Sequence, residues 1–144
     1  MTAKLTGTDA LVTGASSGIG DATARRLAEQ GASVAVVARS QDRLDKLVAE
    51  IEGAGGTAHA VAADITDRTQ AEQAVAEVVD RFGRLDILIN NAGLMHLGPI
   101  VGADVEEWER MIPVNQNGLL YMTNAHGRTC SRRPSTGRGK WPTS

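Results

Sequence analysis

The sequence predicts an α/β protein with a doubly wound parallel sheet, and three observations lead to this fold class. Short apolar runs alternate with segments in which apolar residues recur every three or four positions, which is the alternation of strand and helix. The runs are apolar at nearly every position, as expected of strands that helices cover on both faces. Because crossovers between parallel strands are right-handed, such a chain winds into a doubly wound sheet.

The runs and the periodic segments give the expected elements in order. Strands are expected at 10–12, 34–37, 58–62 and 85–89. Helices are expected from about residue 18, over 44–51, over 71–82, over about 105–111, and over about 117–123. Glycines such as Gly31 and Gly83 follow helices, where a left-handed residue ends them, and Asp67 and Asp104 are expected N-caps.

Composition and charge exclude several classes of protein. Apolar residues make up 42% and charged residues 22% of the 144, as in an ordinary globular domain. The formal net charge of −2 favours neither nucleic acid nor an anionic membrane as a partner. The polar start is unlike a signal peptide, and no apolar run reaches membrane-spanning length. With one cysteine, Cys130, a reducing and therefore cytoplasmic setting is expected. No metal site is expected.

A glycine-rich segment joins the first expected strand to the first expected helix; it reads Thr13-Gly14-Ala15-Ser16-Ser17-Gly18-Ile19-Gly20. Glycines let the backbone turn tightly and approach a pyrophosphate, and a helix N-terminus offers free N–H groups to phosphates. The spacing is G-x-x-x-G-x-G, with Thr23 where the usual dinucleotide fingerprint has its third glycine. A glycine turn without a ligand is the alternative, but the strand before and the helix after favour nucleotide binding.

This turn resembles the nucleotide-binding turn of the short-chain dehydrogenase/reductase family, whose fold is of the Rossmann type. Three later segments resemble family motifs in the same order, namely Asp64-Ile65, Asn90-Asn91-Ala92-Gly93, and Val114-Asn115 followed by Gly118. The resemblance covers residues from about 5 to 125. Pro113 and Gln116 depart from the family pattern around Asn115, and a proline there can kink the helix.

The resemblance implies a role for each matching residue. The cofactor-binding residues of the turn would be Gly14, Ser16, Ser17, Gly18, Ile19 and Gly20. Asp64 and Ile65 would contact the adenine ring. Asn91, Ala92 and Gly93 would line the nicotinamide side, and Asn115 would position a proton-relay water as a catalytic residue. Taken singly, these residues have structural alternatives, because Asp64 could cap a turn, the asparagines 90 and 91 could form one, and Asn115 could be a solvated helix residue.

The choice of cofactor depends on the end of the second expected strand. An acidic residue there would bind an adenosine 2′-hydroxyl and repel a 2′-phosphate. The chain instead has Arg39 followed by Ser40, and a guanidinium suits a phosphate through paired, charge-assisted hydrogen bonds. NADP is therefore favoured over NAD, with a solvated loop charge at Arg39 as the alternative.

The chemistry of the family needs a serine, a tyrosine and a lysine four residues after the tyrosine, and the sequence lacks this set. The single tyrosine, Tyr121, is followed four positions later by Ala125, so Tyr121 is interpreted as a packing residue. The parent protein is expected to be an NADP(H)-dependent oxidoreductase that acts on a small-molecule carbonyl or alcohol, as a homo-oligomer. The chain alone is expected to be inactive; the alternative is a non-catalytic nucleotide-binding module or a pseudogene product.

A change in composition divides the chain into 1–125 and 126–144. The second part has five basic and no acidic residues, which leaves a body of charge −7 and a tail of charge +5. Its Gly, Pro, Ser and Arg indicate disorder. If the gene is GC-rich, the codons of the tail can be inferred and translated in a reading frame shifted by one nucleotide. The result contains HLLAAAV, which is helix-like, DGP, which is typical of a turn, and QVADL, which resembles the start of a strand. We therefore interpret it as a frameshift product, with a natural basic tail as the alternative, and expect a sheet that is incomplete on its C-terminal side and prone to aggregate.

Overall fold

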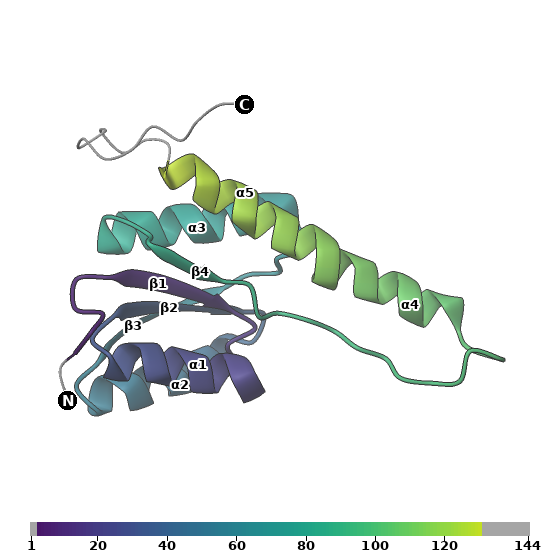
Figure 1. Ribbon diagram of the computed structural model, residues 1–144, viewed down its shortest axis with the longest axis horizontal. Coiled ribbons are helices and arrows are strands. Elements are labelled where there is room, and N and C mark those ends of the chain that lie inside the picture. The colour runs from purple at the N-terminus through teal and green to yellow at the C-terminus, as the bar shows by residue number, and fades with distance from the viewer. Residues whose placement is uncertain (1–2, 131–144) are drawn as a thin grey trace.

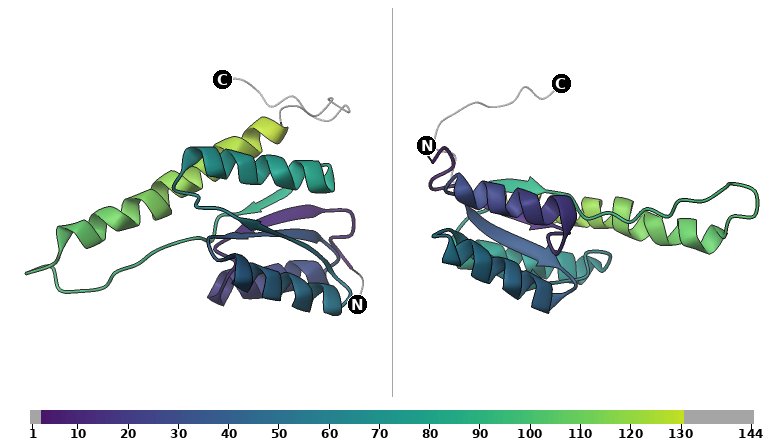
Figure 2. Two further views of the ribbon diagram at one scale, coloured as in Figure 1. Left: turned by 180° about the vertical axis from the view of Figure 1, so that it is seen from behind. Right: turned by 90° about the horizontal axis from the view of Figure 1, so that it is seen from below.

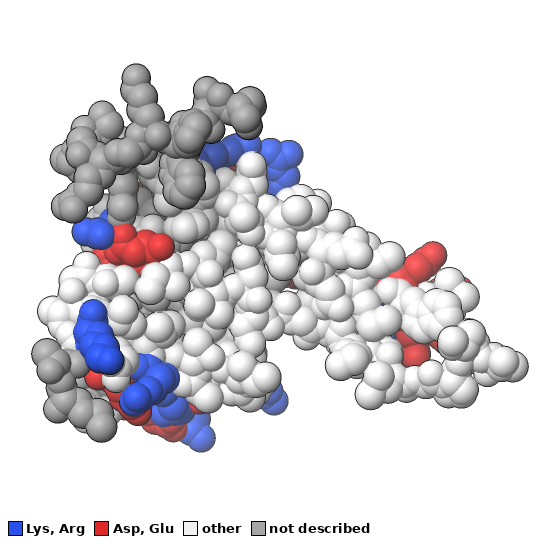
Figure 3. Space-filling model, viewed as in Figure 1, with Lys and Arg blue, Asp and Glu red and all other residues white. Residues whose placement is uncertain are grey.

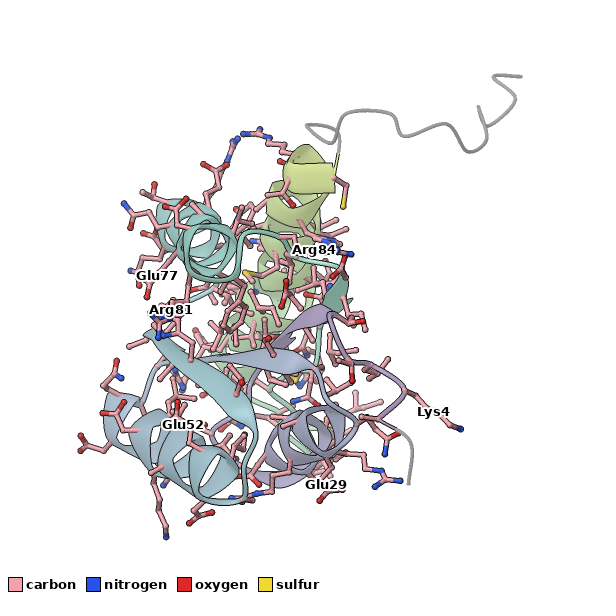
Figure 4. The ribbon with its side chains drawn as sticks, turned by 90° about the vertical axis from the view of Figure 1, so that its left-hand side faces the viewer. Lys4, Glu29, Glu52, Glu77, Arg81 and Arg84 are labelled. Atoms are coloured by element: carbon pink, nitrogen blue, oxygen red, sulfur yellow. The ribbon has the colours of Figure 1, made fainter. Side chains whose placement is uncertain are left out.

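The computed structural model describes residues 3–130, which fold into alternating strands and helices. In chain order the elements are β1 (Asp9–Thr13), α1 (Gly18–Glu29), β2 (Ser33–Ala38), α2 (Gln41–Gly53), β3 (Thr57–Ala62), α3 (Arg68–Phe82), β4 (Ile87–Ile89), α4 (Val105–Ile112), the π-helix η1 (Pro113–Gly118) and α5 (Leu119–Cys130). Helices α1 and α2 cover one face of the sheet, and α3 and α5 cover the other (Figures 1 and 4). The predicted α/β fold class is confirmed.

The four strands are all parallel and lie in the order β3-β2-β1-β4. The chain therefore winds outward from β1 to β3, then returns to the other side of β1 for β4. The direction of winding therefore reverses between the adjacent strands β1 and β4. In sheets of this kind the carboxyl ends of the strands beside such a reversal form a crevice that accommodates ligands. That crevice lies between the glycine-rich turn after β1 and the segment after β4.

Two apolar clusters hold the layers together, one on each face of the sheet. Strands β1 and β2 supply both, and their side chains Leu11, Val12, Val34 and Val36 are fully buried. Because helices cover both faces, these strands are apolar at successive positions rather than at alternate ones, as the sequence predicted. The caps predicted at Asp67 and Asp104 are also present, since each side chain accepts a backbone N–H of the first helical turn.

Strand β4 differs from the central strands β1 and β2, because it has a neighbour on one side only within the described residues. It begins at Ile87, two residues later than the strand expected at 85–89. Leu85 is buried, but it packs in the core cluster before the strand ladder begins. The three residues of β4 are all half-buried.

Helix α4, the π-helix η1 and α5 form one rod, which extends well beyond the sheet (Figures 1 and 2). The sequence predicted two separate helices here. Pro113 opens the π segment, and because proline has no amide hydrogen, the carbonyl four residues earlier loses its helical donor. A local wider turn accommodates such a loss without ending the helix. The expected kink is therefore a change of helical register.

Helix α5 also corrects the boundary expected after residue 125, because it continues to Cys130. His126 contributes to this order, since its Nε2 lies 3.1 Å from the carbonyl oxygen of Leu85. Residues 126–130 are thus helical rather than disordered. The rest of the expected tail lies outside the described residues. No helix within 3–130 has both the length and the apolar composition to cross a membrane.

We expect the isolated chain to self-associate, because no strand of residues 3–130 pairs with the outer edge of β4 and such edges pair with other chains. Size-exclusion chromatography with light scattering should show a mass above that of a monomer that rises with protein concentration. A monodisperse monomer with a sharp, cooperative thermal transition would contradict this expectation.

Candidate functional site

The glycine-rich turn packs directly against the segment that follows β4. Gly14 has a φ of +65°, and a Cβ placed on it would lie 2.7 Å from the Cα of Ala92. A Cβ on Gly20 would collide with the carbonyl oxygen of Gly14 and lie 2.5 Å from the Nδ2 of Asn91. Any side chain at either position would push the two segments apart. These two glycines therefore allow the segments after β1 and β4 to meet at the carboxyl edge of the sheet.

The middle of the turn is exposed, whereas Ala15 is fully buried. Ser17, Gly18 and Ile19 are exposed, and Ile19 has 78% of its surface accessible although it is apolar. Gly18 has a φ of +58°, and a Cβ there would meet no atom within 4 Å. Ser17 is the N-cap of α1, but its side chain makes no capping hydrogen bond. The first amides of α1 are thus not occupied by that cap and can receive an anion.

A buried hydroxyl, that of Thr13, fixes the contact between the two segments. Its Oγ1 accepts the N–H of Asn91 at 3.1 Å and the N–H of Ala92 at 3.0 Å, and it donates to the carbonyl of Ile89 at 3.4 Å. In return, the Nδ2 of Asn91 donates to the carbonyls of Thr13 at 3.1 Å and Gly14 at 3.3 Å. The carboxyl ends of β1 and β4 are thereby joined through side chains as well as through the strand ladder.

Asn115, in the π-helix, reaches the loop that leaves the site. Its Oδ1 accepts the N–H of Leu94 at 2.8 Å, and its Nδ2 donates to the carbonyl of Leu94 at 2.8 Å. The same Oδ1 would lie 3.5 Å from a Cβ on Gly93. The side chain of Asn115 is exposed, but it pins the chain just after Gly93. Asn90 makes a parallel contact, donating to the Oγ1 of Thr123 at 3.0 Å.

Asp64 and Ile65 follow β3 and have different environments. Asp64 accepts the N–H of Thr66 at 3.0 Å and its hydroxyl at 2.7 Å. These bonds lower the pKa of the Asp64 carboxyl, partial burial opposes the change, and the positive charge of Arg39 adds to it. Asp64 therefore forms the turn that was considered as its structural alternative. Ile65 is buried in the core, and Gly118 leaves room for its side chain.

Arg39 directly follows β2 and is exposed, with Ser40 after it as the N-cap of α2. Ser40, like Ser17, makes no capping hydrogen bond through its side chain. The segments after β2 and β3 lie near each other, because the N–H of Ala63 donates to the carbonyl of Ala38 at 2.9 Å. A cation and two uncapped helix N-termini thus lie at one edge of the sheet.

The space-filling view shows how open this edge is (Figure 3). The body and the projecting rod are separated by a notch on the side of α1, and much of the projecting surface is uncharged. Two hollows occur elsewhere on the described part of the chain. One, of about 320 Å³, lies between α1 and α2, and one, of about 570 Å³, lies between α3 and α5. Neither is lined by the glycine-rich turn.

The proton-transfer groups of the family do not gather at this edge within residues 3–130. Tyr121 is half-buried and packs against the core cluster on the α3 side of the sheet. This agrees with its interpretation as a packing residue. The site can therefore offer backbone amides, small side chains and the guanidinium of Arg39, which are groups for binding rather than for proton transfer.

Sequence reasoning missed three residues that organise the site. Thr13 was read as part of the glycine motif, although its hydroxyl joins both segments. Leu94 and Thr123 had no signal of their own, because their roles arise from contacts across 21 and 33 positions of the chain. For Thr13, the position at the end of a buried strand was an available signal, since a buried hydroxyl needs a partner.

Known proteins match the chain over most of its length. Residues 8–138 match the short chain dehydrogenase family. An uncharacterised oxidoreductase of Staphylococcus haemolyticus is 42% identical over 122 residues, which are 85% of this chain and 52% of that protein. The 3-oxoacyl-(acyl-carrier-protein) reductase of Thermotoga maritima is 40% identical over 120 residues, which are 83% of this chain and 49% of that protein.

Solved structures agree. A short-chain dehydrogenase of Burkholderia cenocepacia, solved with NADP, superposes with a TM-score of 0.81 at 39% identity. The match covers 88% of this chain and 52% of the Burkholderia cenocepacia chain. A short-chain type dehydrogenase/reductase of Mycobacterium marinum gives 0.84 at 35% identity, with coverages of 88% and 51%. The chain spans about half the length of these relatives. It belongs to the short chain dehydrogenase family of oxidoreductases.

Proposed function

We propose that this chain is the NADP(H)-binding half of an oxidoreductase that reduces a carbonyl or oxidises an alcohol. The observation that carries the proposal is the junction of the glycine-rich turn with the segment after β4. Gly14 and Gly20 permit that junction, and Thr13 and Asn91 fix it. Such a junction keeps the amino end of α1 at the point where the winding of the sheet reverses, which is where dinucleotides bind in doubly wound folds.

The residues of the turn fit the phosphates of a dinucleotide. The exposed backbone of Ser17, Gly18 and Ile19 precedes a helix whose first amides lack a side-chain cap. These amides and the positive end of the helix dipole favour a negatively charged group. Open space next to Gly18 allows a ligand to approach the backbone closely. We assign phosphate binding to this turn, with Ser16 as a further donor.

Arg39 supports NADP over NAD in this proposal. It is exposed at the end of β2, and the Asp64 carboxyl, on which its positive charge acts, already accepts two hydrogen bonds from Thr66. The guanidinium thus retains donors for a phosphate dianion. The relative from Burkholderia cenocepacia was solved with NADP. Asp64 and Ile65 would border the adenine, and Ile65 would do so through its backbone, because its side chain is buried.

A nicotinamide cofactor would supply or accept the hydride, but the chain has no tyrosine–lysine pair to move the accompanying proton. Asn91, Ala92 and Gly93 would line the nicotinamide side. Asn115 would hold the loop after Gly93 in position. A relay water would bind Asn115 through the hydrogen-bonding positions of its side chain that Leu94 does not occupy. A non-catalytic nucleotide-binding module is the alternative function, favoured by the missing pair.

Titration of the chain with NADPH tests the proposal, and Arg39→Asp tests the choice of cofactor. At low micromolar protein, the variant should bind NADPH more weakly by about 1.5–3 kcal/mol, the scale of a hydrogen bond to a charged group. Binding of NADH should be unchanged or stronger. Arg81→Asp, which makes the same charge change on α3, should leave both affinities unaltered. Absence of NADPH binding by the original chain, or equal losses for both cofactors, would be evidence against the proposal.

Replacing Thr13 with valine should weaken both the fold and cofactor binding. Valine has the same shape but leaves the N–H groups of Asn91 and Ala92 without their acceptor, which costs about 1–3 kcal/mol in the free energy of unfolding. The dissociation constant for NADPH should rise because the turn is no longer fixed. Thr23→Val is the control, since the Thr23 hydroxyl is exposed and donates only to Ile19 within α1. If the two variants behave alike in urea unfolding and NADPH titration, the role of Thr13 is wrong.

The gene downstream of codon 125 tests whether the tail is a frameshift product. A single-nucleotide correction should reopen a long frame that encodes a serine and then a Y-x-x-x-K. The corrected protein should oxidise NADPH with a carbonyl compound, while the 144-residue chain should show no rate above background. If no frame contains a Y-x-x-x-K, the tail is native and the chain is a binding module.

A further inference from the structure

The loop that follows β4 runs outward beside the rod, and α4 returns along it (Figure 1). Beyond Gly93, two hydrogen-bonded contacts join this loop to the rod within residues 3–130. At the first, Asn115 binds both the N–H and the carbonyl of Leu94. At the second, two residues farther along the loop, the N–H of His96 donates to the Sδ of Met111 at 3.3 Å. The loop is thus held to the rod by one amide side chain and one thioether.

The spacing of the two contacts matches on the loop and on the rod. Met111 and Asn115 are four residues apart in a helix, so they lie on one side of the rod at a separation of about 6 Å along its axis. Leu94 and His96 are two residues apart, which in an extended chain is about 7 Å. Both backbone groups of Leu94 bind the same side chain, as in a strand that pairs with a neighbour. Residues 94–96 therefore lie against the rod as a short extended segment that is held at both ends.

Met111 acts on this loop rather than on the core of the sheet. Methionines on helices commonly fill gaps in apolar cores, and Met122 does so, since it is fully buried in the cluster on the α3 side. Met111 is half-buried and belongs to neither of the two apolar clusters of the described residues. Its sulfur is instead a hydrogen-bond acceptor, a role that a thioether can fill and an aliphatic side chain cannot.

We propose that Met111 is a positioning residue for the nicotinamide side of the cofactor site, an inference that rests on the proposed function. One contact alone would allow the loop to turn about Leu94, whereas two contacts fix the direction in which it leaves the site. This loop continues directly from residues 91–93, which would line the nicotinamide side. Beyond His96, packing does not replace the contact, because Leu97 has 87% of its surface accessible.

Met111→Leu tests the proposal in the 144-residue chain, because leucine fills a similar volume but accepts no hydrogen bond. The dissociation constant for NADPH should rise by about two- to tenfold, the range of one hydrogen bond. Binding of 2′,5′-ADP, which has adenosine phosphates but no nicotinamide, should be unchanged, because the groups assigned to that half follow β1, β2 and β3. Met111→Gln should restore the affinity for NADPH, since an amide oxygen can accept the N–H of His96.

Met95→Leu is the matched control, because Met95 lies in the same loop but has 74% of its surface accessible. It should leave the binding of both ligands unchanged. Amide hydrogen exchange at His96 gives a readout that needs no ligand, and it should be faster in Met111→Leu than in the original chain or in Met95→Leu.

Several outcomes would overturn the role of Met111. They are equal weakening of NADPH and 2′,5′-ADP binding by Met111→Leu, an affinity for NADPH equal to that of the Met95→Leu control, a loss as large in Met111→Gln, and unchanged exchange at His96. An original chain that binds neither NADPH nor 2′,5′-ADP would refute the proposed function itself. An original chain that binds both, with no effect of Met111→Leu, would refute the role of Met111 alone.

Discussion

The hydroxyl of Thr13 is the constraint on which the carboxyl edge depends. Buried at the end of β1, it holds the amides of Asn91 and Ala92 and donates to Ile89, while Asn91 returns two bonds to the backbone of Thr13 and Gly14. Because only glycine allows the two segments to approach this closely, the hydroxyl and the glycines act together. The position of the amino end of α1, and the direction in which the chain leaves β4, both follow from this junction.

Within the described residues the sheet continues through β2 and β3 on one side of β1, whereas on the other side it ends at β4. Strands β1 and β2 have neighbours on both edges and apolar clusters on both faces. Strand β4 has one neighbour, and the loop and helix after it expose Leu97, Ile100, Val101 and Trp108. Exposed apolar residues that form a contiguous patch mark surfaces that contact another polypeptide, a membrane or a ligand. The difference arises within a single sheet, because β4 has one neighbouring strand within residues 3–130 whereas β1 and β2 have two.

Local sequence patterns predicted the helices and strands of the fold but not the contacts between residues that are distant in the sequence. Buried strands read as apolar runs, and the caps at Asp67 and Asp104 depend on residues a few positions away. The single rod was missed, because Pro113 indicates a break and the π turn that accommodates it has no sequence signature. The order of residues 126–130 was missed for a similar reason. Composition indicates disorder there, but the contact between His126 and Leu85 joins positions 41 residues apart.

The division of the fold also separates binding from chemistry. Every group proposed to hold the dinucleotide comes from the ends of β1 to β4, so half a sheet can present all of them. In the proposed function, a proton donor would instead approach the nicotinamide from beyond β4. The loop after β4 and the π-helix are held together there by the hydrogen bonds between Leu94 and Asn115. Transition-state stabilisation requires groups that act as the hydride moves, and binding groups alone lower the free energy of the bound state without lowering the barrier. In the proposed function, a four-stranded unit would therefore recognise its cofactor without groups for proton transfer, provided that the junction at Thr13 stays intact.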